Sequence, residues 1–386
     1  MANEPTTTPA SNHPWASDSP GHPQGVPLRF PLMPIPTVDL AQRLRERTAA
    51  HGFTLFGIAP ATEADGFERF AGWLDAGHAG QMEYLHEKRE QRRNPGSILN
   101  SVRTVVMLGF EYGETSPHGP TRIAKYALGP DYHRFLWDKL NDLAAWLEAE
   151  RPGCRAKGAA DSAPLLERDF ARRAGLGWFG KNTMLIDKHR GSFFLLAALL
   201  TSLDLPIDEP HTGSHCGTCT ACLDACPTQA FPEPGVLDAR KCISYLTIEL
   251  RGSIPLELRE PMGGWLFGCD ICQDVCPWNR NSAPGAFPTN PDLVALDPAE
   301  LLGLDEAGFR SRFRGTSFFR AKRTGLLRNA AIVLGNTGDA TAIPALERAL
   351  LDDDEVIREA AEWALARLRQ RLAKVQADSG MRFPSA

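Results

Sequence analysis

The segment 216–227 reads CGTCTACLDACP, from Cys216 to Pro227, and decides how this chain is interpreted. Its spacing, Cys-x₂-Cys-x₂-Cys-x₃-Cys-Pro, is a run that binds [4Fe–4S] clusters. The short spacers let one loop place three thiolates around one cubane, and the proline then turns the chain away. The fourth cysteine of such a run ligates the other of two clusters, so a second, reciprocal run is expected.

The segment 269–277, which reads CDICQDVCP, supplies the second run but lacks its first cysteine. Leu266 stands at that position, and Cys242 is the only sensible replacement. The spacing therefore predicts two [4Fe–4S] clusters with four ligands each. The first cluster is assigned to Cys216, Cys219, Cys222 and Cys276, and the second to Cys226, Cys242, Cys269 and Cys272.

Structural zinc is the alternative for this segment, because paired Cys-x₂-Cys motifs also make tetrahedral sites. Zinc explains neither the two Cys-Pro endings nor the reciprocal spacing. Disulfides are less expected, since tight cysteine spacing without an export signal indicates metal binding in a reducing compartment. Cys154, the ninth cysteine, lies outside the segment and is interpreted as an ordinary thiol.

Composition places the chain among ordinary globular proteins. It has 386 residues, 43% hydrophobic and 23% charged, with a net charge of −5. Its longest fully apolar run, 193–200, is too short to cross a bilayer, and no secretory signal is expected at its start. We therefore expect a cytoplasmic protein that does not bind membranes. A negative total charge means that any nucleic-acid contact must come from a local patch.

The order of apolar patterns predicts an α+β fold. Residues 1–36 hold nine prolines and are predicted to be a disordered tail. Over 37–208, strands alternate with helices. The predicted helices are 38–49, 68–74, 131–150 and 165–174, and the predicted strands are 53–58, 102–110, 184–186 and 192–199.

The end of the chain is predicted to be helical. Segments 328–334 and 358–364 resemble each other, with a further helix at 341–351 between them, which is similar to HEAT repeats. Segment 307–330 contains seven cations and no acid, with phenylalanines between them, which favours contact with phosphates. The cations are Arg310, Arg312, Arg314, Arg320, Lys322, Arg323 and Arg328.

Segment 175–180 reads GLGWFG and matches a dinucleotide fingerprint only in its letters. That fingerprint must follow a strand and open a helix, whereas this segment follows a predicted helix and leads into a strand. Asp161 lies just before the same helix. It is either an N-cap or a proton donor in a pocket. Arg168, two helical turns further on, is either a surface charge or part of that pocket.

Together these residues resemble the epoxyqueuosine reductases, cobalamin-dependent iron–sulfur enzymes that complete queuosine in tRNA. The resemblance covers roughly residues 40–370. It is carried by the order and spacing of several pieces: RRNP at 92–95, YALGPDYH at 126–133, DSAPLLER at 161–168, segment 175–182, both cysteine runs, CISYLT at 242–247 and the C-terminal repeat.

The resemblance implies three domains after the tail. They are a nitroreductase-like cobalamin-binding domain over 37–208, a ferredoxin-like domain with two [4Fe–4S] clusters over 209–290, and a HEAT-like domain that contacts tRNA over 291–386. It implies that Asp161 is the general acid beside the corrin. The other implied cofactor contacts are Arg92, Lys181, Leu185, Ser244 and Asp270, and the implied tRNA contacts are Arg168 and Arg251.

The implied reaction reduces an epoxide to an alkene with two electrons and two protons. A low-potential corrinoid fed by clusters suits this chemistry, and a carboxylic acid held neutral in a dry pocket would protonate the leaving oxygen. We expect a monomer, an external low-potential electron donor and a tRNA anticodon stem-loop as substrate. The alternatives are another corrinoid reductase, such as a reductive dehalogenase, and a plain electron carrier.

Overall fold

The computed structural model describes residues 36–113, 119–280 and 285–378. The predicted tail, except for its last residue, lies outside these ranges. The first part of the chain forms a four-stranded sheet in the order β1-β2-β7-β4, and every neighbouring pair is antiparallel. Its strands are β1 (Leu55–Pro60), β2 (Thr104–Glu111), β4 (Ala156–Ala159) and β7 (Phe194–Thr201).

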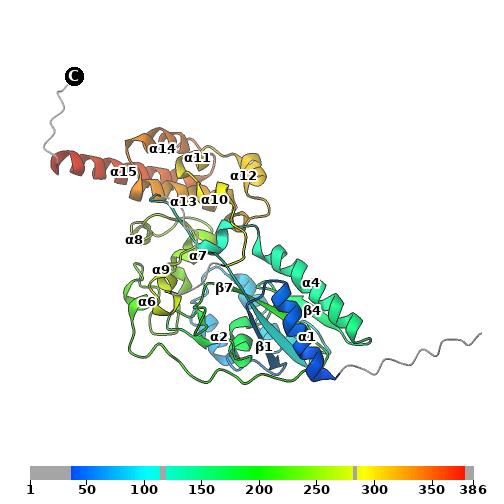
Figure 1. The fold of residues 1–386 in the computed structure, drawn as a ribbon. Coiled ribbons are helices and arrows are strands. Elements are labelled where there is room, and N and C mark those ends of the chain that lie inside the picture. Colours follow the sequence, from blue (N-terminus) through cyan, green and yellow to red (C-terminus); the bar gives the residue numbers. More distant parts are fainter. Residues whose placement is uncertain (1–35, 114–118, 281–284, 379–386) are drawn as a thin grey trace, which may run out of the picture. The chain divides into compact units, whose positions relative to one another are not determined.

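Helices cover both faces of this sheet (Figure 1). On one face, Phe67 and Phe170 pack with Val105 and Met107 of β2. On the other face, α4 lies so close to β4 that a Cβ on Gly158 would come within 2.5 Å of Leu140. The helices are α1 (Thr37–Ala50), α2 (Phe67–Asp75), α3 (Glu83–Glu87), α4 (Tyr132–Glu150) and α5 (Glu167–Arg173).

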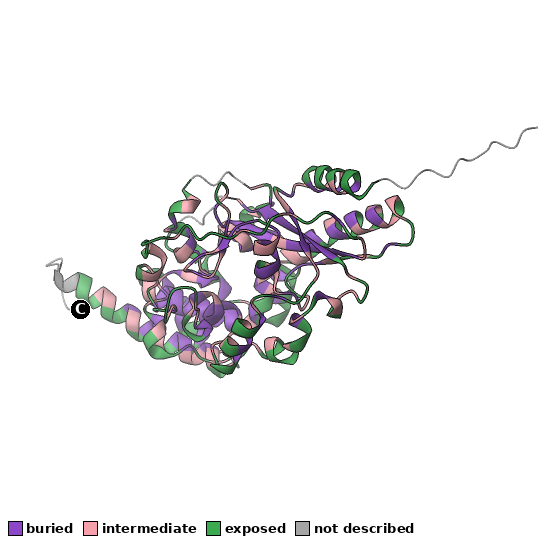
Figure 2. Cartoon of the chain, turned by 90° about the horizontal axis from the view of Figure 1, so that it is seen from below, coloured by how far each residue is buried: buried purple, intermediate pink, exposed green. Residues whose placement is uncertain are grey.

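The position of the sheet between two layers of helices explains why the sequence of β2 is a continuous apolar run. All eight of its residues are buried, because the strand is central and has helices on both sides (Figure 2). The predicted helices and strands of 38–199 are confirmed with shifts of a few residues. One shift matters for the site: α5 begins at Glu167 rather than at residue 165, and this changes the interpretation of Asp161 below.

The cysteine segment is mostly loop with short helices. Helix α6 follows Thr220 in the first run and packs against α9, which follows Asp270 in the second. Strand β8 pairs in parallel with β3 from the first part of the chain. The elements are β3 (Arg122–Ile123), α6 (Ala221–Asp224), α7 (Ile243–Ile248), α8 (Leu256–Arg259), β8 (Trp265–Phe267) and α9 (Ile271–Asp274).

The C-terminal part is helical, as predicted. Helices α13 and α15 lie side by side (Figure 1), and a Cβ on Gly335 would come within 2.8 Å of Ala364 Cα. These helices are α10 (Pro291–Val294), α11 (Pro298–Leu301), α12 (Glu306–Phe313), α13 (Lys322–Thr337), α14 (Ile343–Ala349) and α15 (Glu355–Asp378).

One buried core joins this helical part to the cysteine segment. It contains Leu246 and Phe267 from the cysteine segment, together with Phe318 and Leu327 from the helices. Asn329 crosses the same boundary by donating hydrogen bonds to carbonyl oxygens of α7 and β8, at 2.8 and 3.1 Å. The helical part therefore packs on the cysteine segment through a continuous hydrophobic core.

Candidate functional site

Thiols of the two cysteine runs lie near enough to influence one another. Burial raises the pKa of the Cys276 thiol, and the nearby thiols of Cys216 and Cys219 raise it further. In the second set, Cys242 contributes in the same way to the raised pKa of Cys269. All nine cysteines are free thiols. Cys272 is influenced by Cys242 and Cys226 of its own predicted set and by Cys222 of the other, and no three metal-ligating side chains converge on one point in the ranges described, so the assignment to two clusters stays a prediction.

Cys154 is separate from this arrangement, as expected. It is buried and its Sγ donates to the carbonyl oxygen of Leu147 in α4, at 3.5 Å. Burial raises the pKa of its thiol. It behaves as a small core side chain.

The glycine turn before β5 (Trp178–Phe179) connects the sheet domain to both cysteine runs. At Gly177, φ is +155° and a Cβ would clash with the carbonyl oxygen of Ile186. Lys181 Nζ donates to the carbonyl oxygens of Gly217 and Cys219, at 2.8 and 2.9 Å, in the first run. Asn182 Nδ2 donates to the carbonyl oxygen of Cys272 in the second run, at 3.1 Å.

This geometry confirms that the turn is not a dinucleotide fingerprint, because it follows α5 and leads into β5. It also gives Lys181 partners within the protein, besides the cofactor contact that the resemblance implies. Its ammonium group is engaged by the backbone of the first cysteine run, so it holds that loop in place.

Asp161 lies in the loop before α5 and does not cap that helix. The N-cap position of α5 is Leu166, which has no side-chain cap, so the capping interpretation is wrong. Asp161 Oδ2 accepts hydrogen bonds from the Tyr132 hydroxyl at 2.8 Å and from His133 Nε2 at 2.9 Å. Its backbone N–H donates to Glu167 Oε1 at 2.6 Å. Its φ is +55°, a left-handed conformation that is uncommon for a residue with a side chain.

The first turn of α4 supplies both partners of that carboxylate. Asp131 is the N-cap of α4, because its Oδ1 accepts the backbone N–H of His133 at 3.0 Å. The same oxygen lies 2.8 Å from His133 Nδ1. The Tyr132 and His133 rings are stacked with their centroids 4.1 Å apart. Helix capping therefore places the imidazole between two carboxylates.

The charges at this point decide where the protons are. Burial pushes the pKa of Asp161 upward, but the hydrogen bonds from His133 and Tyr132 outweigh it, so the pKa lies below its usual value. Burial would lower the pKa of His133, but its bonds to Asp131 and Asp161 raise it to about 9. At neutral pH the pair is an imidazolium and a carboxylate. The lowered pKa favours a charged Asp161, whereas the sequence led us to expect a neutral acid at this position.

Glu167 behaves in the opposite way. Burial and the neighbouring charge of Asp161 raise the pKa of Glu167 to about 8. A neutral carboxyl group at Glu167 is compatible with the hydrogen bond that it accepts from the Asp161 backbone. The sequence alone assigns no role to Tyr132, His133 or Glu167. The segments 126–133 and 161–168, which contain them, enter only as carriers of the family resemblance.

The other predicted cofactor residues surround this loop to different degrees. Arg92 is buried, and the charges of Asp161 and Glu167 act on its pKa, which burial lowers. Asp270 is buried beside the second run, where its Oδ2 accepts the backbone N–H of Lys125 at 2.7 Å. Leu185 in β6 (Leu185–Ile186) is buried, and Ser244 in α7 is half-buried.

A row of tyrosines connects the two centres. Tyr126 lies 6.5 Å from Tyr112 and 5.7 Å from Tyr132, measured between ring centroids. Burial raises the pKa of Tyr126, and the charges of both Asp270 and Asp161 add to this effect. The structure therefore brings Asp161, Arg92 and Asp270 into one neighbourhood from three separate segments.

The basic segment differs from its prediction, because acids from elsewhere neutralise it. Arg328 is buried and donates to carbonyl oxygens of 246, 250 and 252. Four other cations form ion pairs, which are Arg310 with Glu306, Arg312 with Glu300, Arg320 with Glu249 and Arg323 with Asp352. Within the described ranges, Arg314 and Lys322 lack an ion pair. The segment as a whole is therefore not a free phosphate-binding surface.

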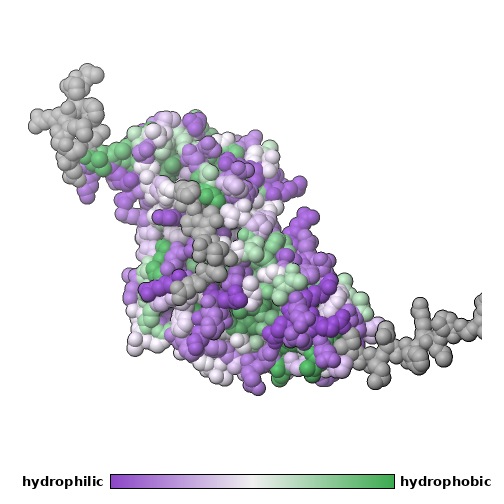
Figure 3. Space-filling view, viewed as in Figure 1, coloured by the Kyte–Doolittle hydropathy of each residue, from purple (hydrophilic) through white to green (hydrophobic). Residues whose placement is uncertain are grey.

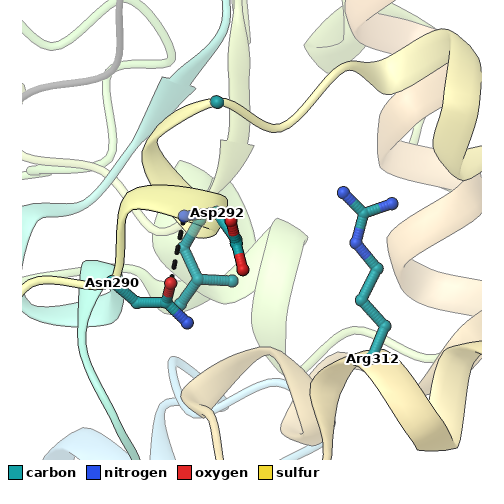
Figure 4. Close-up of a pocket in the computed structure, with 5 residues that line it drawn as sticks. Asn290, Asp292 and Arg312 are labelled. Carbon is teal, nitrogen blue, oxygen red and sulfur yellow. Dashed lines mark hydrogen bonds between the residues drawn. The ribbon is translucent and has the colours of Figure 1, made fainter.

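Two hollows lie beside this segment. Arg310, Ser311 and Arg314 line one of them. In the other, shown in Figure 4, Arg312 faces Asn290 and Asp292, and the Asn290 side chain accepts the backbone N–H of Asp292 at 3.0 Å. The first hollow is basic and the second contains charges of both signs.

The two arginines expected to contact tRNA are held by backbone oxygens. Arg168 is exposed, but its guanidinium donates to the carbonyl oxygen of Thr183. It is not two turns along a shared helix from Asp161, because α5 begins only at Glu167. Arg251 donates to the carbonyl oxygens of Ala321 and Arg320, at 3.1 and 2.9 Å.

In the described part of the chain, no helix has both the length and the apolar character needed to span a membrane. Figure 3 shows hydrophilic and hydrophobic side chains mixed over the visible face.

Comparisons with family models match three consecutive parts of the chain. The model for Epoxyqueuosine reductase QueG, DUF1730 matches residues 92–162. The model for a 4Fe-4S double cluster binding domain matches residues 215–279. The model for HEAT repeats matches residues 318–374.

Curated relatives match over most of their own length. The epoxyqueuosine reductase of Gloeobacter violaceus is 44% identical over 78% of this chain and 98% of its own. The epoxyqueuosine reductase of Pseudomonas aeruginosa is 39% identical over 88% of this chain and 98% of its own.

Solved structures agree with the sequence comparisons. The structure of epoxyqueuosine reductase from Streptococcus thermophilus has a TM-score of 0.80 and 28% identity, over 90% of this chain and 96% of its own. A crystal structure of epoxyqueuosine reductase with an epoxyqueuosine-modified tRNA stem loop has a TM-score of 0.78 and 29% identity, over 90% and 95%. The Bacillus subtilis enzyme, solved with the catalytic loop of an aspartate swung out of the active site, has a TM-score of 0.77 and 31% identity, over 88% and 94%.

Proposed function

The chain belongs to the epoxyqueuosine reductase family of oxidoreductases, and we propose that Asp161 protonates the epoxide oxygen while electrons arrive through two [4Fe–4S] clusters and cobalamin. The family reaction turns epoxyqueuosine in tRNA into queuosine. It consumes two electrons and two protons, and the epoxide oxygen leaves as water. The observation that carries the proposal is the placement of Asp161, whose carboxylate is held by Tyr132 and His133 and whose charge acts on Arg92 from another segment.

The clusters are supported by the domain match and by the grouping of the thiols. A 4Fe-4S double cluster binding domain covers both runs. We assign Cys216, Cys219, Cys222 and Cys276 to one cluster, and Cys226, Cys242, Cys269 and Cys272 to the other. Cys219 is exposed, whereas burial raises the pKa of Cys272, so the first cluster would be nearer to solvent. Electrons from an external low-potential donor would enter at that end.

The residues around Asp161 fit a large ligand such as cobalamin. The Asp161 side chain is 60% exposed to solvent, yet burial is the largest single influence on its pKa. Water therefore reaches the Asp161 carboxylate, while the surrounding protein still partly desolvates it. Arg168 has the same combination of exposure and desolvation.

When bound there, a reduced corrinoid supplies the electrons for opening the epoxide. The chain's own residues do the remaining work. Arg92, Leu185, Ser244 and Asp270 would hold the group, and Lys181 would act indirectly by fixing the first cysteine run. Asp161, held by Tyr132 and His133, would place a proton at the leaving oxygen.

We infer that the substrate is a tRNA stem-loop, because a family member has been solved with one. The basic hollow of Arg310, Ser311 and Arg314, together with Lys322, is the surface that remains for phosphate contacts. Arg320 and Arg323 were also expected to contact tRNA, but they pair with Glu249 and Asp352. Their effect on tRNA would be indirect, through the shape of this surface.

An anaerobic assay tests the proposal. Protein with reconstituted clusters is given tRNA that carries epoxyqueuosine, a chemical reductant of low potential, and either cobalamin or no cobalamin. We expect queuosine to form only with cobalamin. Equal conversion without cobalamin would contradict the cofactor, and no conversion in either condition would contradict the reaction itself.

A further inference from the structure

A continuous chain of hydrogen bonds leads from Asp131 through His133 to Asp161. The His133 ring contacts Asp131 Oδ1 through Nδ1 at 2.8 Å and Asp161 Oδ2 through Nε2 at 2.9 Å. Asp131 is itself fixed as the N-cap of α4. The imidazole side chain is 28% exposed, so it contacts solvent as well as the Asp161 carboxylate. The proposed function uses this histidine only to hold Asp161 and gives it no part in proton transfer.

The proposed reaction leaves a gap that such a group could fill. Two protons are consumed in each turnover, whereas Asp161 can hold one at most. In this structure Asp161 also accepts two hydrogen bonds at the same oxygen, which is the arrangement of a carboxylate rather than of an acid. A carboxylate must receive a proton before it can donate one.

We propose that His133 is a positioning residue that supplies protons to Asp161, taking them from solvent between transfers. In the step, the Nε2–H bond of the imidazolium breaks and an Oδ2–H bond forms on Asp161. The ring becomes neutral and Asp161 becomes the acid that protonates the epoxide oxygen. A proton from water then restores the imidazolium, so the cycle can supply the second proton. This inference rests on the proposed role of Asp161.

The groups that face His133 support a charged ring in the resting state. Two carboxylates, Asp131 and Asp161, contact its two nitrogens. Tyr132 stacks on one side at 4.1 Å, and the Trp137 ring lies 6.0 Å away. Glu167 also acts on this site, and its raised pKa keeps it neutral below about 8. No cation contacts the ring among the described residues, and its bonds to Asp131 and Asp161 outweigh the burial that opposes its protonation.

Tyr132 is the competing proton source, because its hydroxyl contacts the same oxygen at 2.8 Å. Burial and the charge of Asp161 raise its pKa well above the ordinary value for tyrosine. A phenol of that kind keeps its proton, so it orients Asp161 without supplying a proton. The pH dependence of turnover therefore distinguishes His133 from Tyr132 as the source of the proton.

The sign of the pH dependence follows from the charge of His133. With the pKa of His133 raised to about 9, the ring is protonated at neutral pH and loses its proton as the pH rises through that value. Turnover should therefore decline above about pH 9. Replacing Asp131 by Asn keeps a good N-cap but removes one charge beside the ring. The decline should then begin at a lower pH.

The test measures turnover against pH for four variants with reconstituted clusters and cobalamin. His133→Gln keeps a donor to Asp161 but cannot titrate, so turnover should fall at least tenfold and lose the decline above pH 9. His133→Ala should fall similarly and recover in imidazole buffer. Asp131→Asn should move the decline to lower pH. Tyr132→Phe should lower turnover without moving the decline.

His51→Gln is the matched control, because His51 is also a partly buried histidine near a carboxylate, 4.0 Å from Asp142, but lies away from Asp161. It should match the unchanged protein. Near-normal turnover of His133→Gln with an unchanged pH profile would overturn the proton supply. Asp161→Asn separates this from the proposed function: if it is inactive while His133→Gln is normal, only the histidine inference fails. If Asp161→Asn is also normal, the proposed acid fails.

Discussion

The loop around Asp161 and the basic segment 307–330 are both rich in charge, but their charges are used in opposite ways. Around Asp161, an acid, a histidine and a second acid converge on an open surface and remain accessible to water. In the basic segment, four of the seven cations form ion pairs, two of them with acids that lie far away in the sequence, Glu249 and Asp352. A count of charges in one segment therefore does not predict whether those charges face a partner.

The largest effect is expected from Asp161→Asn, which tests the accessible side of this comparison. Asn keeps the shape of the side chain but cannot deliver a carboxyl proton, so turnover should fall on the order of 10²–10⁴-fold. The absorbance of cobalamin and of the clusters should be unchanged, because no ligand is altered. Because Asp161 is not a helix cap, folding stability should also change little. Turnover within a few fold of normal would show that these converging charges are not catalytic.

The next largest effect is expected in the basic segment 307–330, where ion pairs neutralise cations. Arg323 lies against Asp352, with 18% and 9% of their side chains exposed, and its NH1 is 3.1 Å from Asp352 Oδ1. Arg323→Ala would remove the ion-pair partner of Asp352, whose Oδ1 would keep the hydrogen bond from the Asp354 backbone N–H at 3.0 Å, and this should cost about 1–3 kcal/mol of unfolding free energy. Chemical denaturation measures this loss.

Arg320→Ala is the control for Arg323, since its side chain is 51% exposed in its pair with Glu249. Exposed pairs of this kind contribute about 1 kcal/mol or less. Equal stability losses for the two variants would mean that the basic segment is not divided into buried and exposed pairs as described. A phosphate-contact role for Arg323 would instead leave stability intact and weaken tRNA binding.

The cysteine segment differs from both of these regions, because the spacing of its cysteines, rather than their charge, identifies its ligands. Cys242→Ser should remove one cluster, which lowers the iron content from about eight to about four per chain. Cys154→Ser is the matched control and should leave about eight, since Cys154 is a core thiol bonded to Leu147. Iron analysis after reconstitution measures both. Unchanged iron in Cys242→Ser would show that the position of Leu266 is filled in some other way.

These three regions also show what could be predicted from the sequence. Cysteine ligands follow spacing, because a loop can wrap a cluster locally, and buried strands such as β2 follow from continuous apolar runs. The environment of Asp161 could not be derived in this way. His133 comes from 28 residues earlier in the chain, and only packing of α4 against the sheet brings it to the loop.

The pairing of the basic segment was hidden for the same reason. Glu249 lies 71 residues from Arg320, so the segment reads as unbalanced although the folded protein balances it. Arg328 reads as one cation among several, yet its position in α13 buries it against carbonyl oxygens of the cysteine segment. The residues next to Arg328 in the sequence could have indicated its burial. Arg328 lies within the apolar run of the predicted repeat, where a solvated side chain is unexpected.

The smallest effect, and the finest test of the comparison, concerns Arg314. It is the cation in 307–330 that lines a basic hollow and lacks an ion pair in the described ranges. If it contacts a phosphate, Arg314→Glu should weaken tRNA binding a few fold and reduce the salt dependence by roughly one unit of slope. Arg312→Glu is the matched control, because Arg312 lies in the same helix but faces Asn290 and Asp292 in the mixed hollow (Figure 4). It should leave the slope unchanged. An equal loss of slope in both variants would mean that tRNA contacts the whole segment, and that the ion pairs seen here open when it binds.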